Sequence, residues 1–443
     1  MRISRGKNGK LIWHWYNSRL AIVLESILIG FITGFVIVLL RVALSRGDNF
    51  RLWLYGVLPK MPWYWTGLWI LGLIAVGLFL GFTAKKWPMI RGSGIPQVKG
   101  ALKRQMTMRW LPELPLKIIT GILGLGAGLS MGREGPSIQI GAYVGRGVVS
   151  LFHRPHKERQ YLISAASAAG LAAAFNAPLA GVLFVQEELQ SGSMPILVAC
   201  SMGASMAADA VTSIFFGLGP IFDFKYIDVL PLRDFPWIIV LGIICGLFGD
   251  LFKRSLYLSQ DLYKRLKIPE IALPVLPLLL SVPLGFFLFD ITGGGHSLIE
   301  SLPVVNRSLA MICVLFAGKF IFTALCYGSG TAGGIFLPVL ACGALAGTAL
   351  GQILETAGWA ADGQGLNFLI LGMAAFFTAV VKAPVTGIVL ILEMSGNLNH
   401  LSGLVLVSLS AYLTTELIAS PPVYVVLLDR MLAGKKKQHD SEP

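Results

Sequence analysis

Long apolar runs alternate with short polar and basic segments along this chain. The pattern predicts membrane-spanning helices at four places: Leu20–Leu40, Trp65–Phe82, Trp237–Leu251 with its flanks, and Leu401–Ile418. A helix needs about 20 apolar residues to cross a hydrocarbon core, and these runs approach or reach that length. Composition agrees, since 55% of the 443 residues are hydrophobic and only 13% are charged. We therefore predict an all-α polytopic membrane protein.

The basic residues collect in the segments between the apolar runs. The formal net charge is +13, and the five basic clusters fall at 2–10, 85–104, 154–159, 253–267 and 435–437. Cytoplasmic loops are rich in Lys and Arg, so we place all five clusters in the cytoplasm and favour this interpretation over nucleic-acid binding. The interval 217–236 has no positive excess and reads as an external linker. The predicted organisation is a cytoplasmic segment (1–19), two membrane repeats (20–216 and 237–433) and a cytoplasmic tail (434–443).

Glu134 lies between two apolar stretches, in the string Gly132–Pro136. A carboxylate near the middle of a bilayer costs about 2.5–3.5 kcal/mol on insertion scales, so it is a functional-site candidate. The limb that follows, Ser137–Leu151, is about 22 Å long as a helix, which is short of a hydrocarbon core of about 30 Å. We therefore expect Glu134 to lie within the membrane, reached from the outer side.

Asn176-Ala177-Pro178 interrupts the next apolar limb, because a proline and its predecessor disfavour a continuing helix. A return of the chain at this point keeps the basic segment 253–267 in the cytoplasm. The same return puts Glu187 and Glu188 at the cytoplasmic end of the limb.

An internal repeat supports this arrangement of broken helices. Residues 176–187 match 382–393 at an offset of 206, and residues 128–136 match 330–338 at an offset of 202. Two halves of about 200 residues are therefore expected to share one fold, as in transporters built from inverted-topology repeats with broken and re-entrant helices. Glu187 has a counterpart in Glu393, which indicates a shared structural role. Glu188 pairs with Met394, so it is the better functional candidate.

Three glycine-rich strings, at 92–96, 132–136 and 330–338, each end in a proline before an apolar helix. This is the arrangement of a helix N-terminus with proline in its first turn. Such termini present unpaired N–H groups and the positive end of the helix dipole, so several that converge make an anion site. Ser93 adds a hydroxyl at the first string.

With these three strings in this order, the sequence resembles the CLC family of chloride channels and chloride/proton antiporters, over nearly the whole chain. The resemblance implies two antiparallel halves per subunit, a homodimer, and an anion held near the membrane midplane. It also implies a set of chloride-binding positions, which in this sequence are Ser93, Gly135, Ile335, Phe336 and Tyr424. Without the resemblance, Tyr424 would read as a tyrosine of the membrane interface.

The resemblance further implies that Glu134 is the external gate and Glu188 the internal proton-transfer residue, with Glu187 as a possible substitute. Lys117 matches a basic position of the family; it either tunes the local field or snorkels to the membrane surface. The chain after Leu432 is short and basic, so we expect a prokaryotic-type member without CBS domains.

The expected function is secondary active exchange of chloride for protons in the inner (plasma) membrane, with both termini cytoplasmic. The alternative is a passive voltage- or pH-gated chloride channel of the same fold, which Glu188 disfavours because channel members usually carry an apolar residue there. An enzyme is not expected, because the six histidines have no ligand or triad spacing. We expect no metal and no cofactor, chloride as substrate, and chloride, protons, lipid and a second copy of the chain as partners, with no nucleic acid.

Overall fold

The structure is a computed structural model that describes residues 7–151, 154–190, 194–222, 224, 230–359, 361 and 363–439. The side chains of 7–18 and 435–439 are not described. The basic clusters at 2–10 and 435–437, and three of the charged residues of the 217–236 linker (Asp223, Lys225 and Asp228), therefore lie outside the described side chains.

The described residues form seventeen α-helices joined by short turns. Those of the first half are α1 (Lys7–Val57), α2 (Trp63–Lys86), α3 (Ile95–Leu102), α4 (Trp110–Gly126), α5 (Glu134–Leu151), α6 (His156–Phe175), α7 (Pro178–Phe184) and α8 (Pro195–Phe216). Those of the second half are α9 (Phe235–Arg265), α10 (Val275–Phe287), α11 (His296–Ser301), α12 (Leu309–Gly328), α13 (Phe336–Thr356), α14 (Leu366–Val381), α15 (Pro384–Ser395), α16 (Leu401–Leu417) and α17 (Val423–His439).

The prediction of an all-α membrane protein is confirmed. Within the described residues there is no strand, only two isolated bridges, Gly92–Ala332 and Gly132–Gly334. Seven helical segments of this part are long and apolar enough to cross a membrane, and three of the four predicted runs lie in them. The fourth run forms the 17-residue α16, which is too short to be counted among the seven. Helix α1 already begins at Lys7, well before the predicted start of the first repeat at residue 20.

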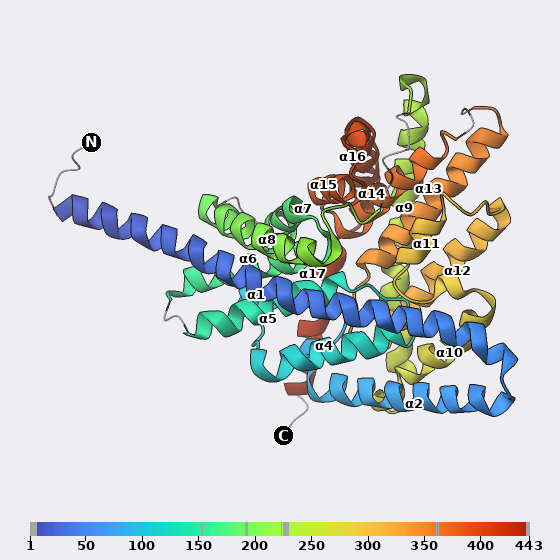
Figure 1. The fold of residues 1–443 in the computed structure, drawn as a ribbon, viewed down its shortest axis with the longest axis horizontal. Helices are drawn as coiled ribbons and strands as arrows, with labels where there is room; N and C mark the ends of the chain where they lie inside the picture. Colours follow the sequence, from blue (N-terminus) through green and yellow to red (C-terminus); the bar gives the residue numbers. More distant parts are fainter. Residues whose placement is uncertain are drawn as a thin grey trace.

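The two halves pack in the same pattern. Helix α5 packs on α6 and α1 on α8 in the first half, and α13 packs on α14 and α9 on α16 in the second. In Figure 1 the blue-to-green first half and the yellow-to-red second half lie side by side, with α17 where they meet, in contact with α3 and α14. These contacts are compatible with the shared fold of the two halves, which stays a prediction.

The predicted breaks before Pro178 and Pro384 are present in both halves. Asn176 ends α6 at φ 49° and Lys382 ends α14 at φ 63°, both left-handed conformations that stop a helix. After the first break the chain doubles back, since Gly181 of α7 packs against the backbone of Ala168 in α6. There a side chain would meet the Ala168 carbonyl oxygen at 2.6 Å. Helix α7 therefore runs back beside α6.

Glu187 and Glu393 cap these re-entrant helices reciprocally. The Glu187 carboxylate accepts hydrogen bonds from the backbone N–H groups of Val385 (3.2 Å) and Thr386 (2.7 Å) at the start of α15. The Glu393 carboxylate accepts from Leu179 (3.0 Å) and Ala180 (2.8 Å) at the start of α7. Carboxylates suit helix N-termini, which carry unpaired donors and positive partial charge. Each half thus completes a helix end of the other.

We expect Glu187→Ala and Glu393→Ala to destabilise the protein by similar amounts, about 0.5–2 kcal/mol each, because each removes a helix cap. Thermal unfolding of the purified protein in detergent would measure the effect. Glu270→Ala is the matched control, because Glu270 is 56% exposed and pairs with Arg91 at the surface. Such a pair contributes about 0–1 kcal/mol. Unequal effects of the two capping variants would contradict equivalent roles.

Two basic residues from the predicted loop clusters are buried instead. Lys253 is 1% exposed and its ammonium donates to the carbonyls of Ala379 (3.0 Å) and Pro421 (3.1 Å). Lys99 is 7% exposed and pairs with a carboxylate. The expectation that these clusters form loops was therefore wrong for Lys99 and Lys253, which lie in α3 and α9 and bind buried polar groups. The cytoplasmic placement of the clusters stays a prediction.

Candidate functional site

The three glycine-rich strings converge in the interior. The N–H groups of Gly132 and Gly334 each donate to the carbonyl of the other, at 2.7 and 2.8 Å. The first string joins them, because Gly92 donates to the Thr331 carbonyl (2.9 Å) and accepts from Gly333 (3.0 Å). Helices α3, α5 and α13 therefore begin around one place, as the sequence predicts.

Close backbone approach makes glycine necessary at two points of this junction. Gly94 precedes α3 with φ 89°, a left-handed conformation that favours glycine. A Cβ on Gly135 would lie 2.8 Å from both the Cβ and the carbonyl oxygen of Ser93. The first turn of α5 thus rests directly on the loop that carries Ser93.

Glu134 is fully buried in the first turn of α5. Neither carboxylate oxygen has a hydrogen-bond partner among the described residues, and the side chain folds back over Gly132. The groups that interact with it favourably are the charge of Arg133 and the backbone N–H groups of Glu134 and Leu337. The acid therefore has backbone donors nearby but no hydrogen bond to a described residue.

The other predicted chloride-binding residues are also buried. Ser93, Ile335, Phe336 and Tyr424 have no exposed surface. The Tyr424 hydroxyl has no hydrogen-bond partner among the described residues. It lies within electrostatic range of both Glu134 and Glu188. Tyr424 therefore does not face lipid, as a belt tyrosine of the membrane interface would.

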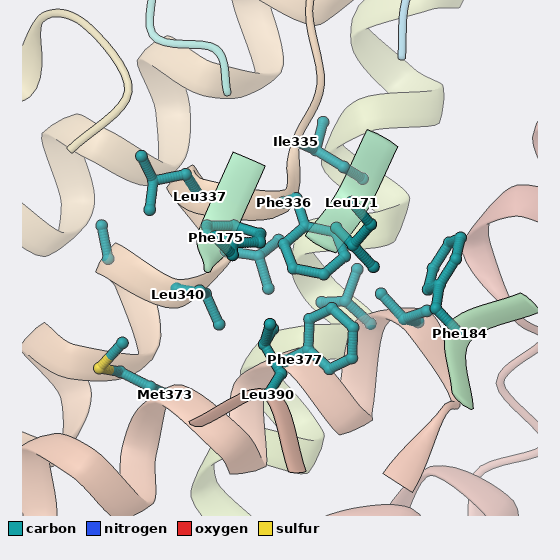
Figure 2. Close-up of a cluster of buried hydrophobic side chains, with 14 of the residues drawn as sticks. Leu171, Phe175, Phe184, Ile335, Phe336, Leu337, Leu340, Met373, Phe377 and Leu390 are labelled. Atoms are coloured by element: carbon teal, nitrogen blue, oxygen red, sulfur yellow. The ribbon is translucent and has the colours of Figure 1, made fainter. Parts of the chain in front are cut away.

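Aromatic packing fixes the start of α13. The Phe336 ring lies 4.5 Å from that of Phe377, 5.4 Å from that of Phe175 and 6.2 Å from that of Phe184, centroid to centroid. Figure 2 shows these rings gathered around Phe336, with Ile335 at the edge of the cluster. Helices α6, α7 and α14 thus hold the first N–H groups of α13 in place. The side chain of Phe336 is apolar and packed, so only its backbone can bind a polar ligand.

Lys117 is fully buried and braces the Ser93 loop. Its ammonium donates to the carbonyls of Ile90 (2.9 Å) and Gly92 (2.7 Å). Lys319, also fully buried, donates to Ile291 (3.1 Å) and Gly293 (2.7 Å) in the second half. The snorkelling alternative for Lys117 is therefore wrong. Lys319 was not predicted from the sequence, although its offset of 202 from Lys117 equals that of Gly330 from Gly128.

The paired glutamates have different environments. Glu187 is used as a cap of α15, whereas Glu188 lies in a π-helical turn, Val185–Leu189, that follows α7. Such turns are rare and frequently occur at functional sites. Glu188 is 4% exposed, and its Oε1 lies 2.7 Å from the Lys99 ammonium. The sequence offered no signal for this ion pair.

A cavity of about 840 Å³ reaches the glycine-rich loops on another side. Gly92, Tyr327 and Gly330 line it, and so do four basic residues: Lys85, Arg91, Lys264 and Arg430. Tyr327 in turn interacts with Ser93. Glu188 and Lys99 are not among its lining residues, so the cavity and the buried ion pair are separate features.

Among the described residues no group of three or more His, Cys, Asp or Glu side chains is arranged to hold a metal ion.

Comparison with known proteins gives consistent matches. A family model described as voltage gated chloride channel matches residues 76–416. The chain is 35% identical to the H(+)/Cl(-) exchange transporter ClcA of Citrobacter koseri, over 98% of this chain and 93% of that protein. It is 34% identical to the protein of the same name from Vibrio cholerae serotype O1, over 96% and 92%.

Solved structures agree with these matches. The fold is similar to that of a slow cyanobacterial Cl-/H+ antiporter, with a TM-score of 0.88 and 29% identity over 93% of this chain and 98% of the other. A eukaryotic CLC transporter shares the fold with a TM-score of 0.73 at 21% identity, over 93% of this chain and 74% of the other.

Proposed function

Because the chain belongs to the voltage-gated chloride channel (CLC) family, we propose that it is a secondary active transporter that exchanges chloride for protons. The observation that carries the proposal is the pair of buried carboxylates, Glu134 and Glu188, both of which interact electrostatically with the buried Tyr424. A simple anion pore needs no buried acid away from its anion site. Relatives named as exchange transporters support the same function.

Chloride would bind where the helix N-termini meet. The N–H groups of Ile335 and Phe336 at the start of α13, the Gly135 backbone at the start of α5, and the hydroxyls of Ser93 and Tyr424 are the donors we assign to it. Partial charges at helix ends stabilise an anion without a permanent cation, so the ion is not held too tightly to leave. The unpartnered Tyr424 hydroxyl supports this assignment.

Glu134 would act as the external gate. When ionised, its carboxylate is itself an anion beside the N–H of Leu337, the residue that follows the Ile335 and Phe336 donors assigned to chloride, and would keep chloride away from them. When protonated it loses that advantage and can swing away. Chloride occupancy and proton binding would therefore alternate at one residue, the coupling that exchange requires.

Glu188 would pass protons between the cytoplasm and the interior. It is separate from the basic cavity, which we assign as the cytoplasmic route of chloride because positive residues concentrate anions there. Glu187 is the weaker candidate for the relay, since both of its oxygens are engaged with α15.

The proposed transporter would have its two repeats inverted relative to each other across the inner membrane, with both termini cytoplasmic. It would assemble as a homodimer. The reciprocal caps of Glu187 and Glu393 support the inversion. The rival function is a passive chloride channel, which would conduct chloride through the same site without moving protons.

A vesicle experiment separates exchange from passive flow. Purified protein in liposomes would be given a chloride gradient, no pH gradient and a voltage held at zero with potassium and valinomycin. We expect the chloride gradient to drive protons, read as a change in external pH that uncoupler abolishes. Chloride flux with no proton movement would identify the passive channel.

We expect Tyr424→Phe to weaken chloride binding by about tenfold or more, because a hydrogen bond to a charged group is worth about 1.5–3 kcal/mol. Isothermal titration with chloride would measure it. Tyr263→Phe is a control, since Tyr263 lines the basic cavity but does not belong to the assigned site. Equal affinity of Tyr424→Phe and the unmodified protein would remove Tyr424 from the chloride site.

A further inference from the structure

Glu188 forms a buried ion pair that the proposed function does not use. The Lys99 ammonium lies 2.7 Å from Glu188 Oε1, and the two side chains are only 9% and 5% exposed. In the surface pair Lys264–Asp261 the corresponding values are 69% and 44%. Solvent screens the surface pair but not the buried one, so each charge of the buried pair depends on its partner.

Few other charges act on Glu188. Lys103, just after α3, attracts it from the surface, and the adjacent Glu187 repels it. Tyr424 faces it from α17 as a neutral hydroxyl. The nearby Gln190 donates to the Ser164 hydroxyl of α6 and brings no charge. Lys99 is therefore the buried cation in direct contact with Glu188, and its loss would leave the carboxylate buried without a contacting countercharge.

The position of Lys99 links two parts of the site. Helix α3 begins directly after Ser93-Gly94 and is eight residues long, and Lys99 lies in its second half. The same helix packs against the π-helical turn of Glu188, against α5 and against α17. One short helix thus carries the Ser93 loop at one end and the partner of the internal glutamate near the other.

We propose that Lys99 is a positioning residue for the internal proton-transfer glutamate: it fixes the Glu188 carboxylate against α3 and favours its ionised form between proton transfers. The proposal rests on the proposed function of Glu188 as the proton relay. Each time Glu188 takes up a proton, its attraction to Lys99 is lost, and it is regained when the proton leaves. The electrostatic interaction of Glu188 with α3, the helix that follows Ser93, therefore changes whenever Glu188 binds or releases a proton.

The test compares Lys99→Met with Lys103→Met in the liposome assay, with proton-coupled flux measured as a function of pH. Without Lys99, Glu188 keeps its proton to higher pH. We therefore expect the midpoint of the Lys99→Met profile to rise by about 1–3 pH units, the usual effect of a close opposite charge on a carboxyl group. Lys103→Met removes an exposed charge from the end of the same helix and should move the midpoint far less. Lys99→Arg should restore the original midpoint.

A Lys99→Met profile that superimposes on that of the unmodified protein, or an equal shift in Lys103→Met, would overturn the proposal. If Lys99→Met does not fold, the double variant Lys99→Met/Glu188→Gln decides, because it removes both buried charges. If the double variant folds, the result supports the pairing of Lys99 with Glu188. If the double variant does not fold and the pH midpoint of Lys99→Arg is also displaced, the proposal is overturned. Glu188→Gln alone tests the proposed function separately: if it stays coupled to protons the relay is wrong, whatever Lys99 does.

Discussion

Glu134→Gln is expected to carry chloride without protons. Glutamine has nearly the same shape but can neither ionise nor take up a proton, so chloride and protons no longer compete at the buried position. A positioned proton-transferring side chain contributes about 10²–10⁴-fold, so chloride-driven proton movement should fall by about 100-fold or more. Chloride flux should continue and should lose its pH dependence. Chloride and pH electrodes on the same liposomes would record both.

Glu300→Gln is the matched control for this experiment. Glu300, like Glu134, interacts with the charge of Arg133, but its side chain is 51% exposed in α11. It should remain coupled. A Glu134→Gln protein in which a chloride gradient still drives protons would remove Glu134 from the gate, and an uncoupled Glu300→Gln would mean that the local charge balance, not the gate, is the sensitive element.

The loops of the candidate site were predictable because their signals are local. Glycine before a helix and proline in its first turn describe a helix N-terminus without any knowledge of tertiary contacts. The internal repeat then supplied the long-range information. Once Glu187 and Glu393 were matched, their equivalent roles followed, and the reciprocal caps give those roles a physical form.

The buried lysines were not predictable in this way. Basic residues tend to collect in cytoplasmic loops, so a prediction based on this tendency assigns every lysine between apolar runs to a loop. Whether an ammonium stays in water or enters the bundle depends on carbonyls brought together by folding, such as those of Ala379 and Pro421 around Lys253. Only the internal repeat indicated that a lysine is buried, because Lys117 and Lys319 are separated by the same offset as the repeated glycine-rich strings.

Tyr424 shows the limit of composition arguments. A tyrosine after Pro421-Pro422 near the chain end has the features of an interfacial residue, and the family resemblance alone pointed inward. Its burial follows from the contacts of α17 with α3 and α14. Helices α3 and α17 are more than 300 residues apart in the sequence. No local pattern encodes such a contact.

Glu188→Gln is expected to abolish proton movement while chloride flux continues, because the chloride donors lie on other elements. Loss of the relay should lower chloride-driven proton movement by about 100-fold or more. Glu187→Gln is the closest control: it neutralises the neighbouring carboxylate, which caps α15, and should stay coupled. If Glu188→Gln remains coupled and only the double variant is uncoupled, the two glutamates substitute for each other. Coupling that survives in the double variant would mean that protons enter elsewhere.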